Sequence, residues 1–132
     1  MPNLDAWSPR VLSVLRIITA LLFMEHGLMK LFHFPGAPEG LPDPLPTIAV
    51  VAGWLEIVGG GLVVLGLATR AAAFLLSGEM AVAYFIAHVS RGGFWPGLNG
   101  GEGAILFCFF FFYLVFAGPG PWSLDDALSK RR

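Results

Sequence analysis

The chain has 132 residues, of which 56% are apolar and 13% are charged, against about 25% charged residues in an ordinary soluble domain. This composition excludes a soluble enzyme, because four membrane crossings of about 20 residues each would leave room for little besides loops. Eight lysines and arginines against nine acidic residues give a net charge of −1. No basic run could follow a nucleic-acid backbone, so nucleic acid is excluded as a partner.

Four long apolar stretches predict four helices. The chain is therefore expected to be all-α, a single domain that forms an antiparallel bundle of four transmembrane helices. The first stretch lies between Pro9 and Pro35, residues that favour helix boundaries. It is too long and too charged for the apolar part of a secretory signal, so it is expected to remain as the first membrane helix. The expected helices cover residues 11–32, 47–67, 70–90 and 102–117.

The first two connections differ in kind. Residues 35–46, called the strap below, contain five prolines in twelve residues. This composition favours a stiff, extended segment over a helix. The second and third helices are separated by Ala68 and Thr69 alone, which requires a tight antiparallel hairpin.

Two further segments are expected at the membrane surface. The loop 91–101 is rich in glycine and carries Phe94 and Trp95, and aromatic residues suit the membrane interface. Ser123, with an acidic residue three positions later, resembles a capping box. It predicts a short C-terminal surface helix over residues 124–130.

Basic residues are divided unequally between the two ends of the expected bundle. Lys30 and Arg91 fall at one end, and five basic residues fall at the end that holds both termini. By the positive-inside rule the termini are expected in the cytoplasm, with the strap facing outward from the bacterial inner membrane. The five residues at the terminal end are Arg10, Arg70, Lys130, Arg131 and Arg132.

The ionisable side chains within the apolar stretches are the most informative feature. A carboxylate in hydrocarbon is costly unless it is paired, hydrated or protonated. With a rise of about 1.5 Å per residue, Glu56 and Glu79 are expected about 14 to 16 Å below the outer surface, where they could face each other. Two carboxyls that close would not both ionise, so one should carry a proton at neutral pH. Seven residues are expected to form a polar funnel that opens outward: Glu25, His26, Lys30, Glu56, Glu79, His88 and Glu102.

Small residues flank Glu56 on its helix. Gly53 and Gly60 lie within about 60° of it at about 100° per residue, so a neighbouring helix can approach closely on this face. One interpretation is that Glu56 binds a proton or a ligand. The alternative is that it bonds to a hydroxyl or an arginine and holds the bundle together.

The first helix leaves two arrangements open. Glu25 lies about 180° from Arg16 around the helix, so both cannot face the bundle axis. Either Arg16 and Lys30 extend their charges to the headgroups and leave Glu25 inside, or Glu25 faces a subunit contact. The polar stripe on the side of Arg16 contains Arg16, Thr19, His26 and Lys30.

Carboxylates and histidines in a four-helix bundle also raise the question of a di-iron site. Such sites use Glu-x-x-His pairs, whereas Glu25 and His26 are adjacent and Glu79 and His88 are nine residues apart. No metal is therefore expected, and haem ligation has no spacing to support it. The histidines are expected at the wet helix ends, with a proton relay or a ligand contact as the alternative.

The fourth helix offers a broad aromatic wall. Packing against lipid is the simpler interpretation, and contact with a flat ligand such as a quinone is the alternative. The wall consists of Phe107, Phe109, Phe110, Phe111, Phe112 and Phe116.

A set of motifs runs through the chain in order: Arg16 and Gly27-x-x-Lys30, Glu56 before a glycine run, Gly66-x-Ala-Thr-Arg70, Glu102, Gly118-Pro119-Gly120, and Ser123-Leu124-Asp125. As a set, over nearly the whole chain, it resembles the DoxX family of small bacterial membrane proteins. The resemblance implies a four-helix membrane bundle. For some members it also implies association with redox systems: a quinone-linked thiosulfate oxidoreductase, or complexes with superoxide dismutase and a sulfurtransferase.

The first functional hypothesis is a membrane redox-accessory protein whose funnel, centred on Glu56 and Glu79, handles protons or a small lipid-soluble ligand such as a quinone. Because Cys108 is the single cysteine, no thiol pair can form within the chain. Electrons would then come from the ligand or from the cofactor of a redox partner protein. The alternatives are a small proton- or cation-coupled transporter and a non-catalytic membrane scaffold for a redox complex.

Small residues on two helices also suggest contacts between helices, and a second copy of the chain is one candidate partner. Ala49-x-x-x-Gly53 and Ala83-x-x-x-Ala87 form faces that permit close helix contacts. Such contacts would lie within one chain or between copies in a homo-oligomer.

Overall fold

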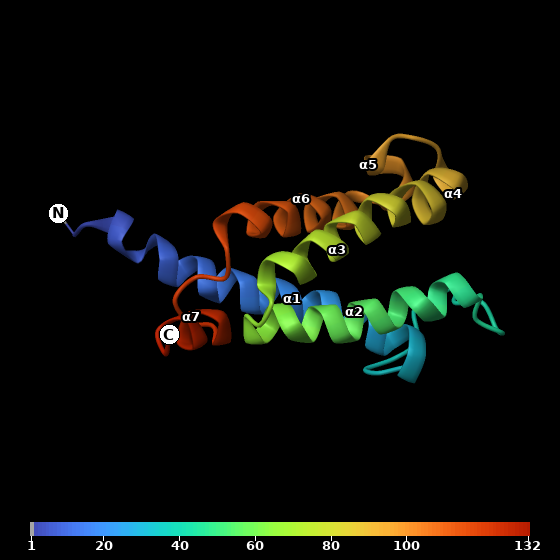
Figure 1. Ribbon diagram of the computed structural model, residues 1–132. Coiled ribbons are helices and arrows are strands. Elements are labelled where there is room, and N and C mark those ends of the chain that lie inside the picture. Colours follow the sequence, from blue (N-terminus) through green and yellow to red (C-terminus); the bar gives the residue numbers. More distant parts are fainter. Residues whose placement is uncertain (1) are drawn as a thin grey trace.

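The computed structural model describes residues 2–132 and contains helices and loops, with no strand in that range. Successive long helices run in alternating directions, and the strap joins the first two at one end of the molecule (Figure 1). The long helices are α1 (Ser8–Phe32), α2 (Thr47–Leu65), α3 (Thr69–Ala83) and α6 (Glu102–Ala117). The shorter elements are η1 (Leu4–Trp7), the π-helical η2 (Tyr84–Val89), α4 (Ser90–Gly92), α5 (Pro96–Asn99) and α7 (Leu124–Ser129).

Three continuous helical segments are long and apolar enough to cross a membrane. They are Leu4–Phe32, Thr47–Leu65 and Thr69–Gly92, with 29, 19 and 24 residues. The fourth apolar helix, α6, has 16 residues, which gives it a length of about 24 Å against a hydrocarbon core of about 30 Å. The chain is thus all-helical in the described range, with three helices of spanning length and a shorter fourth.

Helix ends follow local backbone chemistry. Pro9 lies in the first turn of α1, where a missing N–H removes no helical hydrogen bond. Helix α2 ends at Gly66, which has a φ of +67° and whose N–H bonds to the carbonyls of Leu62 and Val63. Glycine adopts this left-handed conformation without a steric penalty, so the chain reverses sharply into α3.

Helices α1 and α2 pack closely because glycines leave room between them. A Cβ atom placed on Gly27 would lie 2.5 Å from the carbonyl oxygen of Gly53, and one on Gly60 would lie 2.5 Å from Cγ of Met24. Gly53 itself contacts Leu31. The glycine face expected beside Glu56 is therefore used within the chain, against α1.

Large side chains fill the space between this pair of helices and the pair formed by α3 and α6. Phe23 of α1 meets Phe107 and Phe111 of α6 edge to face, with ring centroids 5.3 and 4.9 Å apart. Leu76 of α3 packs on Gly59 of α2. Aromatic edge-to-face pairs are favourable beyond their buried area, so they hold the two helix pairs together.

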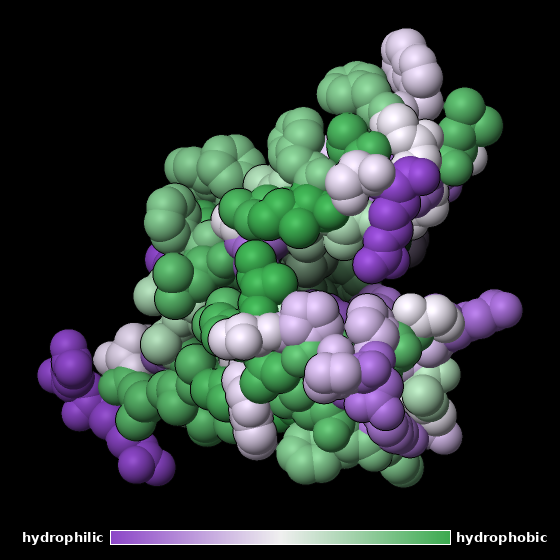
Figure 2. All heavy atoms as spheres, turned by 90° about the vertical axis from the view of Figure 1, so that its right-hand side faces the viewer, coloured by the Kyte–Doolittle hydropathy of each residue, from purple (hydrophilic) through white to green (hydrophobic). Residues whose placement is uncertain are grey.

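Apolar side chains also cover the outside of the long helices. Ile18 is 53% exposed, Phe74 is 64% exposed and Phe109 is 66% exposed. Figure 2 shows extensive green surface over both helix pairs. A continuous apolar exterior of this kind is typical of a protein surrounded by lipid.

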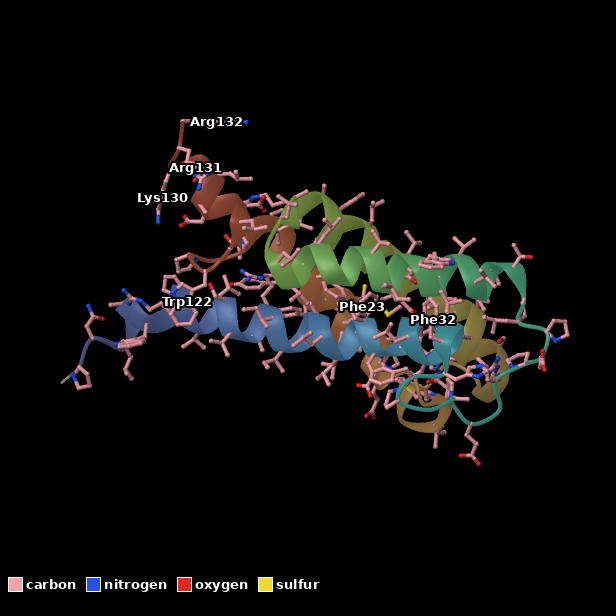
Figure 3. All side chains as sticks on the ribbon, turned by 90° about the horizontal axis from the view of Figure 1, so that it is seen from below. Phe23, Phe32, Trp122, Lys130, Arg131 and Arg132 are labelled. Atoms are coloured by element: carbon pink, nitrogen blue, oxygen red, sulfur yellow. The ribbon has the colours of Figure 1, made fainter. Side chains whose placement is uncertain are left out.

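Arg16 lies inside the bundle, with 0% of its surface exposed. Its guanidinium donates to the carbonyls of Pro119, Val64 (3.3 Å) and Trp122 (2.7 Å). Figure 3 shows Trp122 beside α1. The arrangement in which Arg16 extends to the headgroups is therefore wrong, because these carbonyls bind both terminal nitrogens of the guanidinium inside the protein.

Residues 118–125, called the C-terminal latch below, close this end of the bundle. The carboxylate of Asp125 accepts hydrogen bonds from the backbone N–H groups of Ala68 (2.8 Å) and Thr69 (2.9 Å), at the start of α3. Burial raises the pKa of Asp125, but these hydrogen bonds and the charge of Arg16 outweigh it and lower the pKa below its usual value. The ionised carboxylate thus caps α3 and ties the latch to the hairpin between α2 and α3.

The latch continues into the short helix α7. Ser123 caps it by accepting a hydrogen bond from the backbone N–H of Asp126 at 3.1 Å. Helix α7 spans Leu124–Ser129, where a helix over 124–130 is expected from the capping pattern. Arg70 reinforces the same end by donating to the carbonyls of Val115 and Phe116 in the last turn of α6.

Candidate functional site

An ion pair lies at the interface of α1 and α2. Nζ of Lys30 lies 2.7 Å from Oε1 of Glu56. The side chain of Glu56 is 2% exposed, whereas that of Lys30 is 27% exposed. The close approach of the helices at Gly27 and Gly53 brings the two side chains together, since each charged residue follows one of these glycines by three positions.

A second carboxyl group lies near this pair. Glu79 of α3 interacts electrostatically with both Glu56 and Lys30. Neither of its side-chain oxygens has a hydrogen-bond partner within residues 2–132, and both are fully buried. Oε2 of Glu56 is likewise buried without a partner. The site thus combines one cation with two carboxyls, and three of their four oxygens carry no hydrogen bond from the described chain.

A pocket of about 320 Å³ lies under the strap, next to the ion pair. Lys30 lines this pocket and also binds Glu56, so it connects the pocket to the interior of the bundle. Figure 2 looks onto this end of the molecule and shows purple and white residues gathered there, beside a notch between the upper and lower helix pairs. The other lining residues are His33, Ala37, Pro38, Gly40, Leu41, Pro42, Asp43 and Leu45.

The remaining residues of the expected funnel are spread more widely. Glu25 is half-buried on α1 and has no hydrogen bond or ion pair within the described residues. His26 is exposed, with its ring against Phe107. Glu102 is exposed at the start of α6. The structure therefore gathers Lys30, Glu56 and Glu79.

His88 belongs to a separate polar network beyond the C-terminal end of α3. Its Nδ1 lies 3.2 Å from the carbonyl oxygen of Asn99. The hydroxyl of Tyr84 donates to the carbonyl of Phe94, and the amide of Asn99 donates to that hydroxyl at 3.2 Å. These bonds fold the loop after α3 onto the π-helical turn η2, which assigns His88 to the loop rather than to the Glu56 site.

The sequence predicts no metal site, and it leaves open whether the aromatic wall of α6 packs against lipid or contacts a flat ligand. Within residues 2–132 no three or more His, Cys, Asp or Glu side chains are grouped to hold a metal ion. The aromatic wall of α6 divides into two parts: Phe107 and Phe111 pack inward against Phe23, whereas Phe109, Phe112 and Phe116 face outward. The inward part is occupied by core packing.

Sequence reasoning missed two features of the site. It did not connect His33 and Asp43 with Lys30, and it did not pair Lys30 with Glu56. The spacing offered a signal, because Gly27-x-x-Lys30 and Gly53-x-x-Glu56 place a charge three residues after a glycine on each helix. Two helices that meet at those glycines bring the opposite charges together.

Comparisons with known proteins give consistent results. A family model described as DoxX matches residues 11–89. An uncharacterized protein of Haemophilus influenzae is 45% identical, with 99% of this chain and 100% of the relative aligned. An uncharacterized membrane protein of Mycobacterium tuberculosis is 32% identical, with 97% of this chain and 87% of the relative aligned.

A third relative carries a functional name. "Putative oxidoreductase CatD" of Bacillus subtilis is 40% identical over 62 residues, which cover 43% of this chain and 44% of that protein. No solved structure matches the chain.

Proposed function

Because this chain belongs to the DoxX family of membrane proteins, we propose that it is an accessory protein of membrane redox metabolism. Its polar pocket opens to the outer side of the bacterial inner membrane and handles protons or a small lipid-soluble ligand such as a quinone. The site is centred on Glu56 and Glu79.

One observation carries this proposal: Lys30 belongs both to the strap pocket and to the buried ion pair with Glu56. A ligand in the pocket would therefore contact a charged group that is coupled to the bundle interior. An ammonium has three N–H donors, and one hydrogen bond of Lys30, to Glu56, occurs within residues 2–132. The remaining donors suit a carbonyl or another acceptor on a ligand.

The redox assignment is supported by the relative named as an oxidoreductase. The chain has a single cysteine, so it cannot form a dithiol pair of its own. In this proposal the electrons come from the ligand or from the cofactor of a partner protein. This chain supplies the binding site and the carboxyl groups that bind and release protons.

A proton- or cation-coupled transporter is the second candidate. It is favoured by the buried carboxyl oxygens of Glu79, which have no partner within the described residues, because carboxyls inside a membrane commonly mark an ion or proton pathway. A non-catalytic scaffold would instead show neither a bound ligand nor ion movement.

Variants at the two carboxyls test the site. Glu56→Gln and Glu79→Gln are each expected to lose proton movement or ligand retention, because an amide keeps the shape but carries no titratable proton. The cost in unfolding free energy is expected to stay within about 0.6 to 2 kcal/mol. The measurements are quinone in lipids extracted from the purified protein, proton flux into proteoliposomes with a pH-sensitive dye, and thermal unfolding in detergent.

Asp5→Asn is the matched control, because Asp5 is exposed near the N-terminus and outside the site. Wild-type behaviour in both glutamine variants would contradict the site. Wild-type protein without ligand or flux would favour the scaffold. A loss of stability in Glu56→Gln alone, well above the expected range, would assign that residue to interhelical packing.

The proposed topology places both termini in the cytoplasm, with α6 as the fourth crossing. The five basic residues at the terminal end and the two at the other end support it. A C-terminal alkaline phosphatase fusion is expected to be inactive, and the same fusion inserted in the strap is expected to be active. If α6 does not cross, the C-terminus lies outside and the terminal fusion is active, which would overturn the four-crossing topology. An inactive fusion in the strap would overturn the outward direction of the pocket.

A further inference from the structure

The charge balance of the site is uneven, with one cation and two carboxyls. Lys30 is already engaged, because its Nζ lies 2.7 Å from Oε1 of Glu56. Glu56 is 2% exposed, so water cannot solvate its charge. The carboxylate therefore depends on Lys30 as its counter-ion. Lys30 and Glu56 therefore form a neutral pair, and the state of Glu79 decides the net charge of the site.

Glu79 lacks the surroundings that an ionised carboxylate needs. Both oxygens are buried and neither accepts a hydrogen bond within residues 2–132. Two charged groups act on Glu79. Glu56 of α2 would repel a negative charge on it, and Lys30 of α1 is already paired with Glu56. On the side of α6, the thiol of Cys108 lies beside the hydroxyl of Ser77, which itself donates to the backbone carbonyl of Cys108 at 2.8 Å. An isolated buried carboxyl avoids the cost of ionisation by keeping its proton.

We propose that Glu79 is the proton-binding group of this site and that Glu56 remains the fixed, ionised counter-ion of Lys30. The species handled is then a proton, one per chain, carried on the carboxyl of Glu79. This assignment rests on the proposed function, which it narrows from a proton or a ligand to a proton on a named residue.

The same arrangement links the proton to the pocket. When Glu79 releases its proton, its new negative charge competes with Glu56 for the ammonium of Lys30. Lys30 also lines the strap pocket, so a shift of its side chain toward Glu79 withdraws a donor from the pocket. Proton release and binding in the pocket are therefore expected to influence each other.

Infrared spectroscopy of the purified protein tests the assignment through the carbonyl band of an un-ionised carboxylic acid, identified by its shift in D2O. Wild-type protein at neutral pH is expected to show this band from one buried acid, and Glu79→Gln is expected to abolish it. Lys30→Met removes the cation, so both carboxyls should be protonated and the band should grow. Glu56→Gln frees Lys30 to pair with Glu79, so the band should weaken or disappear.

Glu39→Gln is the matched control, since Glu39 is an exposed glutamate outside the long helices, and it is expected to leave the band unchanged. Labelling with dicyclohexylcarbodiimide, which adds to protonated carboxyls in apolar surroundings, gives an independent measurement. Peptide mass spectrometry is expected to find the adduct on Glu79 and not on Glu56.

A band that persists in Glu79→Gln, or an adduct on Glu56 in place of Glu79, would overturn the assignment. Absence of both band and adduct from folded wild-type protein would also overturn it, because Glu79 would then be ionised. These measurements need no ligand, partner or flux. If the proposed function is wrong, the infrared and labelling results still show whether Glu79 carries a proton. If Glu79 does not carry a proton, the flux experiment still tests the proposed function.

Discussion

Arg16→Met is expected to lower the free energy of unfolding by about 3 to 5 kcal/mol, because hydrogen bonds from a charged donor contribute about 1.5 to 3 kcal/mol each and do not add fully. The guanidinium is 0% exposed and donates to three backbone carbonyls. Two of these carbonyls, Pro119 and Trp122, belong to the C-terminal latch. Methionine fills part of the volume but leaves all three acceptors without their donor. The measurement is unfolding in detergent by heat and by added dodecyl sulfate.

The geometry of the donor should matter as much as its charge. Arg16→Lys keeps the cation, but a single ammonium cannot reproduce a planar fork that reaches carbonyls on α2 and on the latch. It is therefore expected to recover only part of the lost stability. The latch should also become accessible to protease near Trp122 in both variants, because its bonds to α1 are lost.

Arg10→Met serves as the control for Arg16. Arg10 is exposed, with one hydrogen bond to the carbonyl of Ala6 and a contact with the ring of Trp7. Its loss is expected to cost less than about 1 kcal/mol. Equal effects of the two substitutions would show that burial of Arg16 does not determine its contribution.

Helix positions follow from hydropathy and from residues whose effect is local. The second helix is expected over 47–67 and is observed over Thr47–Leu65, because Gly66 stops it two residues earlier than the apolar run ends. The third helix, expected over 70–90, continues through a π-helical turn to Gly92. Hydrogen bonds of Tyr84 and Asn99 connect the loop to that turn, and hydropathy does not encode such bonds.

The interior of the bundle was harder to predict than its helices. The helical period showed that Arg16 and Glu25 lie on opposite faces of α1, but not which face is inside. That choice depends on which side chains the other helices present. The latch offers carbonyls to Arg16, and α2 offers a carboxylate to Lys30, so both cations face protein partners although His26 of the same stripe is exposed. Such pairings are set between segments far apart in sequence.

The depth of a residue in the membrane was likewise not enough to predict how the two carboxyls are paired. Equal distances from the membrane surface placed Glu56 and Glu79 at one level, and the structure does bring them within electrostatic range. Depth alone could not reveal that Glu56 is paired and Glu79 is not. The distinction arises from the glycine contact between α1 and α2, since this contact brings Lys30 to Glu56 and leaves Glu79 on the neighbouring helix.

Gly27→Ala is expected to lower the free energy of unfolding by about 1 to 3 kcal/mol, the range for inserting a methyl group into a packed interior. A Cβ at this position would lie 2.5 Å from the carbonyl oxygen of Gly53 and 3.0 Å from Cβ of Glu56. Backbone atoms cannot rotate away as side chains do, so α1 and α2 must separate. The separation should also lengthen the contact between Lys30 and Glu56.

Gly78→Ala is the matched control for Gly27. Gly78 lies in the middle of α3, and a Cβ placed on it would meet no atom within 4 Å apart from the adjacent residues and backbone of its own helix. Alanine is favoured over glycine inside a helix by about 0.5 to 1 kcal/mol, so this variant should be as stable as wild type or more stable. Unfolding in detergent compares the two variants, and the infrared acid band reports on the ion pair. If Gly27→Ala were as stable as Gly78→Ala and kept a wild-type band, the close approach of α1 and α2 would not be what holds Lys30 on Glu56.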